Sequence, residues 1–239
     1  MLITLLYHRA FECPYGNTLD SLEKHFIYLK KHANIVLPFE ELKKHALNVC
    51  ISFDDATFDF YEYVYPLLKK HQIKALLSVP TGFISASETI TPETRISELK
   101  RFPNNSTNAS CYCSFSEIAE MSTSGFVDIA SHGVDHVNLT SKGIDLEKEI
   151  RNSKETLESA LNKKIECFVY PYGRFNKQIH EIVKKYYKLG MRIGNGVNFS
   201  WDSSLHFRIN ADGIKKVASL LGARRRVLGG LKSIKRFYY

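Results

Sequence analysis

The sequence lacks any long hydrophobic run. Hydrophobic residues make up 44% of the 239 positions, but no stretch approaches the roughly 20 consecutive apolar residues that a membrane-spanning helix needs. The apolar start, residues 1–6, has no basic region before it and runs directly into residues 7–9, Tyr-His-Arg. That arrangement is typical of a strand and not of a secretion signal. The two absences together predict a cytoplasmic protein.

Cysteine is also scarce. The chain has five cysteines, an odd number spread over its whole length, which is not the pattern of a disulfide framework. Cys111 and Cys113 have the spacing C-x-C, but no second pair accompanies them. A structural zinc site at these cysteines is therefore not expected.

Charge is abundant and mostly positive. Charged residues make up 24% of the chain, as in ordinary soluble globular proteins, and the formal net charge is +8. A basic surface fits an anionic glycan, an anionic lipid surface or nucleic acid, and net charge alone does not choose among them. Much of the excess lies late in the chain, at Arg224, Arg225, Arg226, Lys232, Lys235 and Arg236.

Apolar runs alternate with segments of helical spacing along most of the chain. The runs that indicate strands include residues 2–6, 34–37, 49–51, 75–79, 126–130, 167–170, 191–193 and 205–209. Segments between them have helical periodicity, and a short helix is also predicted over residues 39–45. Such alternation predicts an α/β fold with a parallel barrel, and 239 residues suffice for one such domain or for two small ones.

Two segments do not follow this alternation. Residues 85–113 are rich in Ser, Thr, Asn and Pro without a sustained period, which predicts an irregular insertion over the barrel mouth or a mobile surface loop. Residues 213–239 are basic, with apolar residues at helical spacing, and they predict a helical tail after a barrel over residues 1–212. Such a tail fits peripheral contact with an anionic membrane surface, or packing on its own domain with a solvated cationic face.

Three polar stretches each follow an apolar run. Asp54 and Asp55 come after residues 49–51, His132 and His136 after residues 126–130, and residues 170–174, Tyr-Pro-Tyr-Gly-Arg, end the run at 167–170. In a parallel barrel the carboxyl ends of the strands share one rim, so these groups are expected to meet there. Neighbouring carboxylates repel each other, and the Asp pair therefore needs a counter-charge.

These stretches resemble the motifs of the polysaccharide deacetylases with a NodB-homology domain. Residues 52–55, Ser-Phe-Asp-Asp, are similar to the first motif of that family, residues 132–136 to its His-x-x-x-His motif, and residues 170–173 to the core of its third. One short motif alone is weak, but the three occur in the family's order. The resemblance covers roughly residues 1–210 and implies a single-domain, distorted (β/α) barrel.

Asp55, His132 and His136 are the expected metal ligands. Two imidazoles and one carboxylate leave coordination positions open, as catalytic zinc sites do. The two histidines are spaced i and i+4 and would share one face if the segment after Ala130 were helical. A His-x-x-x-His pair is often not a metal site, but beside a strand-end Asp pair it predicts a divalent ion, with zinc expected.

The resemblance also implies catalytic roles. Asp54 would be the base that takes a proton from water while Asp55 holds the metal, although an Asp at this place also commonly caps a helix. Tyr172 would donate its backbone N–H to the oxyanion of the tetrahedral intermediate. A strand end punctuated by Pro and Gly would look much the same in sequence.

The chain departs from the family pattern at several places. The Arg that many members carry shortly before the Pro of the third motif is absent, and Arg208 or Arg174 are candidates to replace it. The late Leu-x-His that supplies the acid in many members is also absent, since His206 directly follows a Leu. His8 is the favoured acid, because it follows a strand and would reach the same rim in a closed barrel. A core or solvent-facing His8 is the alternative, and Ala56 stands where the family usually has Gly.

The resemblance and the residues together predict a metal-dependent hydrolase. Its expected reaction removes an N-acyl group, most simply acetyl, from an amino sugar of a glycan or a lipid-linked precursor. Hydrolysis of another C–N bond, such as a formamide or a cyclic ureide, is one alternative. A catalytically inactive carbohydrate-binding homologue is another. The missing Arg and displaced acid favour it slightly, whereas the intact Asp-Asp and His pair argue against it. Nucleic-acid binding is not expected, because no basic face interleaved with aromatics and no reader motif occurs.

Overall fold

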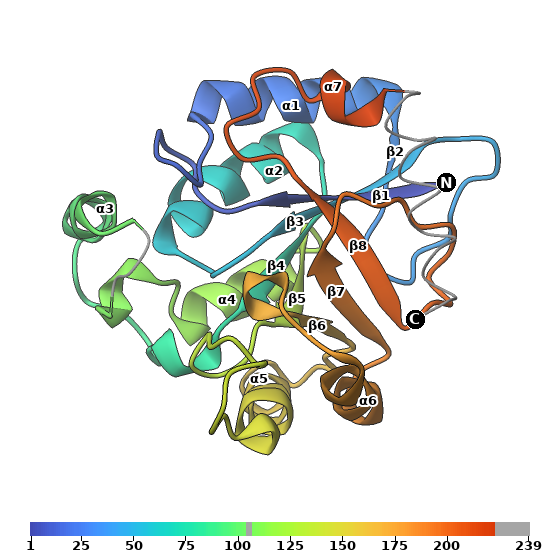
Figure 1. The fold of residues 1–239 in the computed structure, drawn as a ribbon. Helices are drawn as coiled ribbons and strands as arrows, with labels where there is room; N and C mark the ends of the chain where they lie inside the picture. The colour runs from blue at the N-terminus through green and yellow to red at the C-terminus, as the bar shows by residue number, and fades with distance from the viewer. Residues whose placement is uncertain (104–106, 223–239) are drawn as a thin grey trace.

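Parallel strands form a closed barrel. The computed structural model describes residues 1–103 and 107–222. In chain order the barrel strands are β1 (Leu2–Tyr7), β3 (Asn48–Phe53), β4 (Ala75–Val79), β5 (Val127–Ser131), β6 (Cys167–Val169), β7 (Leu189–Ile193) and β8 (Leu205–Asn210). β1 pairs with both β3 and β8, which closes the ring, and the short β2 (Asn34–Ile35) adds to β3. The predicted (β/α) barrel is confirmed (Figure 1).

The strands are apolar because both of their faces are buried. One small core cluster gathers residues that lie largely in the first half of the strands, namely Leu2, Val36, Cys50, Leu76, Ala130, Cys167, Val169, Leu189 and Met191. The alternate residues of the same strands, such as Ile3, Leu5 and Ile51, belong to the larger cluster that the helices cover. Since apolar residues fill the barrel at one end, the polar side chains collect at the other.

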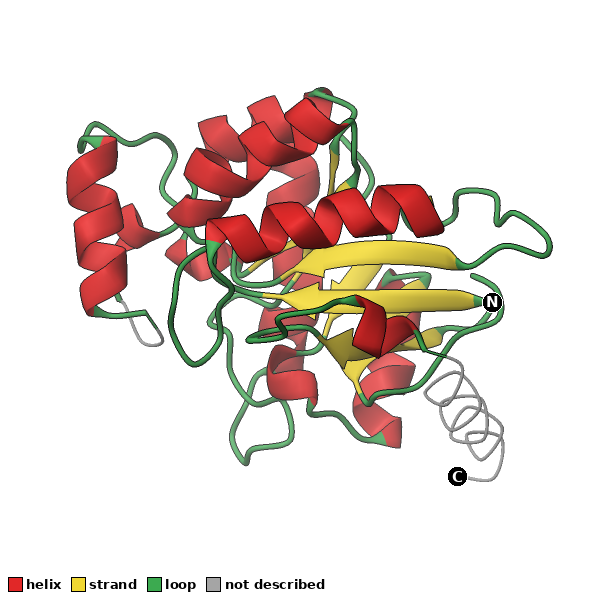
Figure 2. Ribbon diagram, turned by 90° about the horizontal axis from the view of Figure 1, so that it is seen from above, coloured by secondary structure: helices red, strands yellow, loops and turns green. Residues whose placement is uncertain are grey.

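Helices surround the strands (Figure 2). They are α1 (Leu19–His32), α2 (Tyr65–His71), α4 (Phe115–Thr123), α5 (Ser153–Leu161), α6 (Lys177–Tyr186) and α7 (Ala218–Leu221). Two π-helical turns, η1 (Phe60–Val64) and η4 (Lys148–Asn152), lead into α2 and α5. Thr18 caps α1 by accepting a hydrogen bond from the N–H of Ser21. The helix predicted over residues 39–45 is wrong: Phe39 and His45 have positive φ, and the segment forms turns.

The segment 85–113 is not the irregular excursion that its composition predicts. It contains the ten-residue helix α3 (Pro92–Arg101), which Thr91 caps and which lies at the periphery of the ring of helices (Figures 1 and 2). Arg95 of this helix is buried, pairs with Glu117 at 2.6 Å, and lies over the ring of Phe58. The buried Arg95 thus attaches helix α3 to the rest of the fold. The polar composition of the segment did not indicate this helix.

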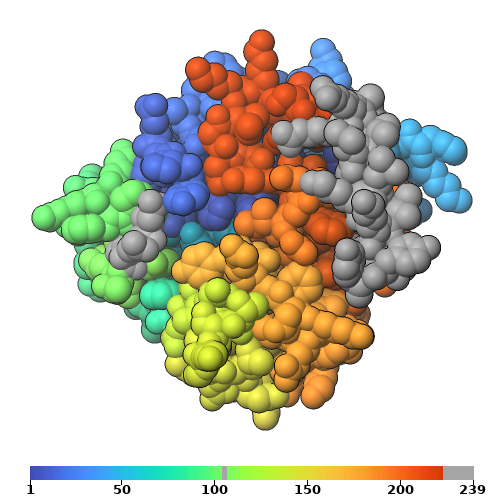
Figure 3. All heavy atoms as spheres, in the orientation of Figure 1, coloured from blue at the N-terminus to red at the C-terminus, as the bar shows by residue number. Residues whose placement is uncertain are grey.

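The segment that follows β8 lies close to the N-terminal segment. Figure 3 shows the N-terminal segment, in blue, in contact with the segment that follows β8, in red, and the N–H of Gly213 donates to the carbonyl of Gly16. Of the predicted basic tail over residues 213–239, residues 223–239 lie outside the described residues. Within the described part of the chain, no helix has the length and apolar character needed to cross a membrane.

Candidate active site

The polar stretches predicted to share a rim do meet at the carboxyl ends of the strands. Asp54 and Asp55 follow β3, and His132 follows β5. The two histidines are not presented by a helix, however. Residues 132–136 form a loop in which Gly133 has φ +80° and His136 has φ +49°, so the expectation of a helical face is wrong. The turns at these left-handed residues, and not the helical repeat, bring the two rings to a centroid distance of 4.7 Å.

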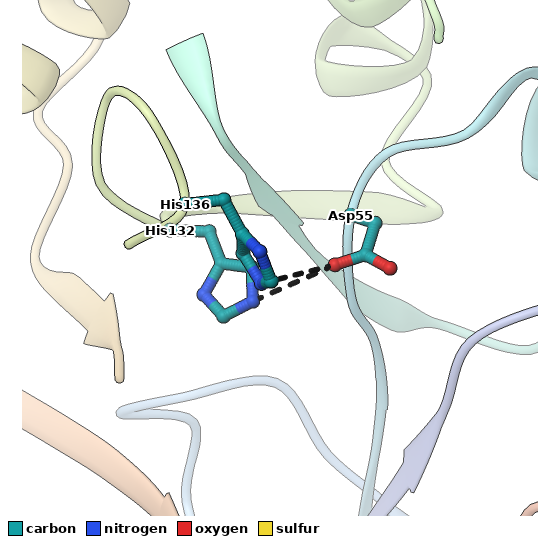
Figure 4. Close-up of side chains that lie close together, drawn as sticks. All are labelled: Asp55, His132 and His136. Carbon is teal, nitrogen blue, oxygen red and sulfur yellow. Dashed lines mark ion pairs between the residues drawn. The ribbon is translucent and has the colours of Figure 1, made fainter. Parts of the chain in front are cut away.

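Asp55, His132 and His136 point toward one another (Figure 4). The Oδ1 atom of Asp55 lies 3.5 Å from Nε2 of His136 and 3.7 Å from Nε2 of His132. One ligand atom from each of the three residues falls within 4.8 Å of the others. Two atoms bound tetrahedrally to one zinc ion at about 2.0–2.1 Å lie roughly 3.3 Å apart. The three donors are therefore already close to the spacing that a divalent ion requires.

His132 is held in the form that binds a metal. Its Nδ1 donates to the carbonyl oxygen of Val169 at 2.8 Å, which leaves the Nε2 lone pair directed at Asp55. Burial lowers the pKa of His132 to about 4, even though the nearby Asp54 and Asp55 charges oppose this shift. The ring is therefore neutral near pH 7, as ligation demands. The residues present fit a divalent ion.

Asp55 uses its two oxygens differently. Oδ1 faces the histidines, while Oδ2 forms an ion pair with Arg9 at 2.9 Å. Burial alone would raise the pKa of this carboxyl, but the charges of Arg9 and of the three nearby histidines lower it below its ordinary value. Asp55 and Ala56 have φ of +74° and +49°. Ala56, which replaces the usual Gly, thus adopts the left-handed conformation that Gly favours, and such backbone strain is typical of functional sites.

Asp54 and Arg208 form a buried two-bond pair inside the barrel. Nη1 of Arg208 donates to Oδ1 of Asp54 at 2.6 Å, and Nη2 donates to Oδ2 at 2.8 Å. Ser78 also donates to Oδ1, at 2.7 Å. Burial would raise the pKa of Asp54, but Arg208, followed by His132, lowers it below its ordinary value. Of the two arginines considered from sequence, Arg208 pairs with Asp54, whereas Arg174 is exposed.

His8 lies at the rim with a carboxylate behind it. Its Nδ1 is 2.6 Å from Oδ2 of Asp212, its backbone N–H donates to Oδ1 of the same residue, and its Nε2 lies 4.0 Å from Oδ2 of Asp54. Burial would lower the pKa of His8, but the hydrogen bond to Asp212 and the charge of Asp55 raise it above the ordinary value. His206 is fully buried and stacks on Trp201 at 5.1 Å.

Tyr172 lies beside His136. It lies in the short turn Pro171–Gly173 with φ +57°, and its side chain is 60% exposed. Its ring centroid is 4.8 Å from that of His136. The left-handed turn directs the segment back over the rim, next to the position where a substrate would reach the histidines.

Three residues of the site have no counterpart among the residues predicted from sequence: Arg9, Asp212 and Glu149. Arg9 pairs with Asp55, Asp212 orients His8, and Glu149 accepts hydrogen bonds from the loop between the two histidines. Arg9 follows His8 directly at the end of a predicted strand, and this position could have indicated that Arg9 belongs to the site. Asp212 and Glu149 act over long sequence separations, and no local pattern reveals them.

Fold and site together define a class: a parallel barrel with a carboxylate and two imidazoles at its rim and a second, paired carboxylate beside them. The sequence profile described as "Polysaccharide deacetylase" matches residues 42–193. The chain belongs to the polysaccharide deacetylase family. Its recognition from three motifs is therefore confirmed.

Individual relatives agree with this assignment. The poly-beta-1,6-N-acetyl-D-glucosamine N-deacetylase of Staphylococcus aureus (strain MRSA252) is 26% identical over 171 residues, covering 68% of this chain and 50% of the relative. The chain thus spans about half the length of the curated relatives it matches. Among solved structures, IcaB from Ammonifex degensii has a TM-score of 0.76 at 21% identity, over 94% of this chain and 97% of that one. Streptococcus pyogenes deacetylase PplD in complex with acetate has a TM-score of 0.71 at 23% identity, over 92% and 96%.

Proposed function

We propose that this chain is a metal-dependent hydrolase that removes the N-acetyl group from an amino sugar of a glycan. The observation that carries the proposal is the joint placement of Asp54 and the three ligand residues: Oδ2 of Asp54 lies 3.7 Å from Nε2 of His132, at the edge of the ligand set. A base and a metal site that share one edge are what hydrolysis of an amide by water requires.

Asp55, His132 and His136 would hold the ion, and zinc is the ion that this donor set fits best. When bound, a divalent ion lowers the pKa of water and polarises a carbonyl oxygen. The pKa of Asp54 is depressed, so this carboxylate is ionised and free to accept a proton, but it is a weak base. Asp54 can therefore act only on water that is already acidified, which explains why base and metal site lie side by side.

Residues on either side of the proposed metal site are candidates for the remaining steps, stabilisation of the oxyanion and protonation of the leaving amine. The backbone N–H of Tyr172 is the candidate donor to the oxyanion, because its turn borders the ligand His136. His8 is the candidate acid for the leaving amine, since Asp212 holds its Nδ1 and raises its pKa, which keeps a proton available near neutrality. An Asp that orients a His through Nδ1 leaves Nε2 free to face the substrate.

The substrate class follows from the amide chemistry and from the family. The Staphylococcus aureus relative is named for poly-beta-1,6-N-acetyl-D-glucosamine, so β-1,6-linked N-acetylglucosamine oligomers are the first substrate to test, and a lipid-linked amino sugar is the second. A non-catalytic carbohydrate-binding role was favoured only by the missing Arg and the displaced acid. Arg208 donates to Asp54, and Nε2 of His8 lies 4.0 Å from Asp54, so both are candidates for these two roles, which supports the enzymatic proposal.

The purified protein is expected to bind about one divalent ion per chain and to release free amines from β-1,6-linked N-acetylglucosamine oligomers. The double variant His132→Ala, His136→Ala removes two of three ligands and should lose both properties. Metal content is measured by elemental analysis, and amine release by a fluorescent amine reagent.

The matched control is His32→Ala, His45→Ala, which removes two exposed histidines away from the rim and should change neither property. Metal content that stays at the wild-type level in the rim variant would refute the proposed site. A metal-bound protein that releases amines from formamides, or opens cyclic ureides to ureido acids, but acts on no N-acetyl sugar would assign the site to the alternative substrates.

The proton donor is tested by comparing two histidine variants. His8→Ala is expected to lower kcat by about 10²-fold with KM and metal content little changed, because the leaving amine then lacks its acid. His206→Ala should change kcat much less, since His206 lies inside the barrel against Trp201 and far from solvent. The measurement is kcat on the best substrate for both folded variants. A larger loss in His206→Ala would assign the acid to β8 and leave His8 a structural role.

A further inference from the structure

The loop between the two histidine ligands lies over a buried carboxylate. Glu149 is only 2% exposed, and it comes from the π-helical turn η4 that precedes α5. Its Oε2 accepts hydrogen bonds from the N–H of Val134 at 2.9 Å and of Asp135 at 3.1 Å. Both N–H groups belong to the three-residue connection between His132 and His136. One carboxylate therefore holds the middle of the loop whose ends are the metal ligands.

Glu149 is itself fixed in place. Ser153 donates to the backbone carbonyl of Glu149 at 2.7 Å, and Ser131, at the end of β5, donates to Ser153 at 2.7 Å. Ser131 in turn accepts a hydrogen bond from the N–H of Gly133. The strand, the histidine loop and the π-helical turn are thus connected by a closed set of hydrogen bonds. Single π-turns within helices occur frequently at functional sites.

The approach of the loop to Glu149 requires glycine at position 133. Gly133 has φ +80°, and a Cβ atom there would lie 2.8 Å from Oε2 of Glu149. A side chain at this place would push the loop away from the carboxylate. The positive φ of Gly133 and its lack of a side chain therefore allow the loop to lie directly against Glu149.

Burying a carboxylate without a neighbouring buried cation is unfavourable unless hydrogen bonds compensate it, and the N–H groups of Val134 and Asp135 supply them. Burial raises the pKa of this carboxyl, while the N–H groups of Asp135 and Val134 oppose that shift. The neighbouring cation, Lys148, is exposed and pairs with Asp135, at the outer side of the loop. The Glu149 carboxylate therefore holds the backbone of residues 134 and 135, which connect the two histidine ligands.

We propose that Glu149 is a positioning residue that sets the distance and orientation between His132 and His136 by anchoring residues 133–135. It touches neither substrate nor metal, and it determines how tightly a first-row divalent cation binds. The inference rests on the proposed metal site. Residues that orient the ligands of a metal from behind typically affect its affinity by about 10–100-fold.

The experiment titrates the apo protein with Co²⁺, whose visible absorption reports the coordination geometry, well below the melting temperature of each variant. Glu149→Gln keeps the size of the side chain but removes the negative charge that faces the two N–H groups and replaces one acceptor oxygen by an NH₂ group. We expect it to bind Co²⁺ about 10–100-fold more weakly, with an altered spectrum. Glu155→Gln, the same change on the exposed face of the same helix, should match the wild type.

An unchanged dissociation constant and spectrum in folded Glu149→Gln would overturn the inference, as would an equal loss in Glu155→Gln. If Glu149→Gln does not fold, Glu149→Asp decides: the shortened carboxylate should weaken Co²⁺ binding at least several-fold, and wild-type affinity would overturn the inference. Failure of the wild-type protein to bind Co²⁺ would instead refute the proposed metal site.

Discussion

Asp54→Asn is expected to lower kcat by at least about 10²-fold while metal occupancy stays near that of the wild type. The amide is nearly isosteric with the carboxylate, and its oxygen can still accept a hydrogen bond from Arg208. It cannot, however, take a proton from water. Because Asp54 lies beside the ligand set and is not one of its three members, the change separates the chemical step from metal binding. The measurements are kcat on the best substrate and the metal content of the same preparation.

Asp128→Asn is the matched control, since Asp128 lies on barrel strand β5 and pairs with Lys163 away from the ligand set. It should leave kcat and metal content unchanged. A contradictory result is also well defined. If Asp54→Asn loses the metal and regains activity when metal is added in excess, Asp54 is a ligand, and the roles of the two neighbouring carboxylates are reversed.

Arg208→Met should produce the largest loss of stability among these variants. Arg208 is fully buried and carries both strong hydrogen bonds to Asp54. Removal of one partner of a buried ion pair leaves an uncompensated charge and costs about 3–5 kcal/mol. The free energy of unfolding is measured by denaturant titration. Activity should fall as well, because Asp54 loses the group that orients it.

The effect of this substitution should depend on pH. The folded-state pKa of Asp54 lies below its ordinary value, so the stability from its pairing is fully present above the unfolded pKa of about 4 and is lost as the pH falls. The difference between wild type and Arg208→Met should therefore be largest near neutrality and shrink in acid. Arg174→Met is the control, and as an exposed change it should stay within about 0.5 kcal/mol. A greater loss in Arg174→Met would give the orienting role to Arg174.

The barrel and the meeting of its motifs were predictable from sequence for a simple physical reason. Parallel strands buried on both faces appear as apolar runs, and their carboxyl ends must share one edge. Asp55 and His132 could thus be brought together without any knowledge of the loops. The same reasoning does not extend to the path of residues 132–136, because it depends on left-handed φ values at Gly133 and His136 that spacing does not reveal.

The structure was needed to compare Arg208 with Arg174 as the partner of Asp54, and His8 with His206 as the candidate acid. Arg208 and His206 are two residues apart on one strand and share a face, and only their depth in the barrel separates them. Arg208 reaches Asp54, whereas His206 lies at Trp201. Sequence patterns report which face a residue occupies and not how deep it lies. Helix α3 was missed for a different reason: its local signals, the Thr91 cap and a basic last turn, span only ten residues of a segment whose overall composition is that of a loop.

Barrel closure has a consequence for the order in which this site is completed during synthesis. The profile match ends at residue 193, before β8, and the three ligand residues all precede that point. The groups that balance and orient the reacting carboxylate and the acid come later: Arg208 is 154 residues from Asp54, and Asp212 is 204 residues from His8.

A nascent chain that has emerged only as far as β7 thus contains the three proposed ligands, but Asp54 lacks its counter-charge Arg208 and His8 lacks its carboxylate partner Asp212. Arg208 arrives with β8, which inserts between β7 and β1, and Asp212 follows two residues after the end of that strand. Insertion of β8 closes the ring and completes the catalytic groups in the same event. Addition of the final strand therefore separates a chain that has only the proposed metal ligands from one that also has the partners of Asp54 and His8.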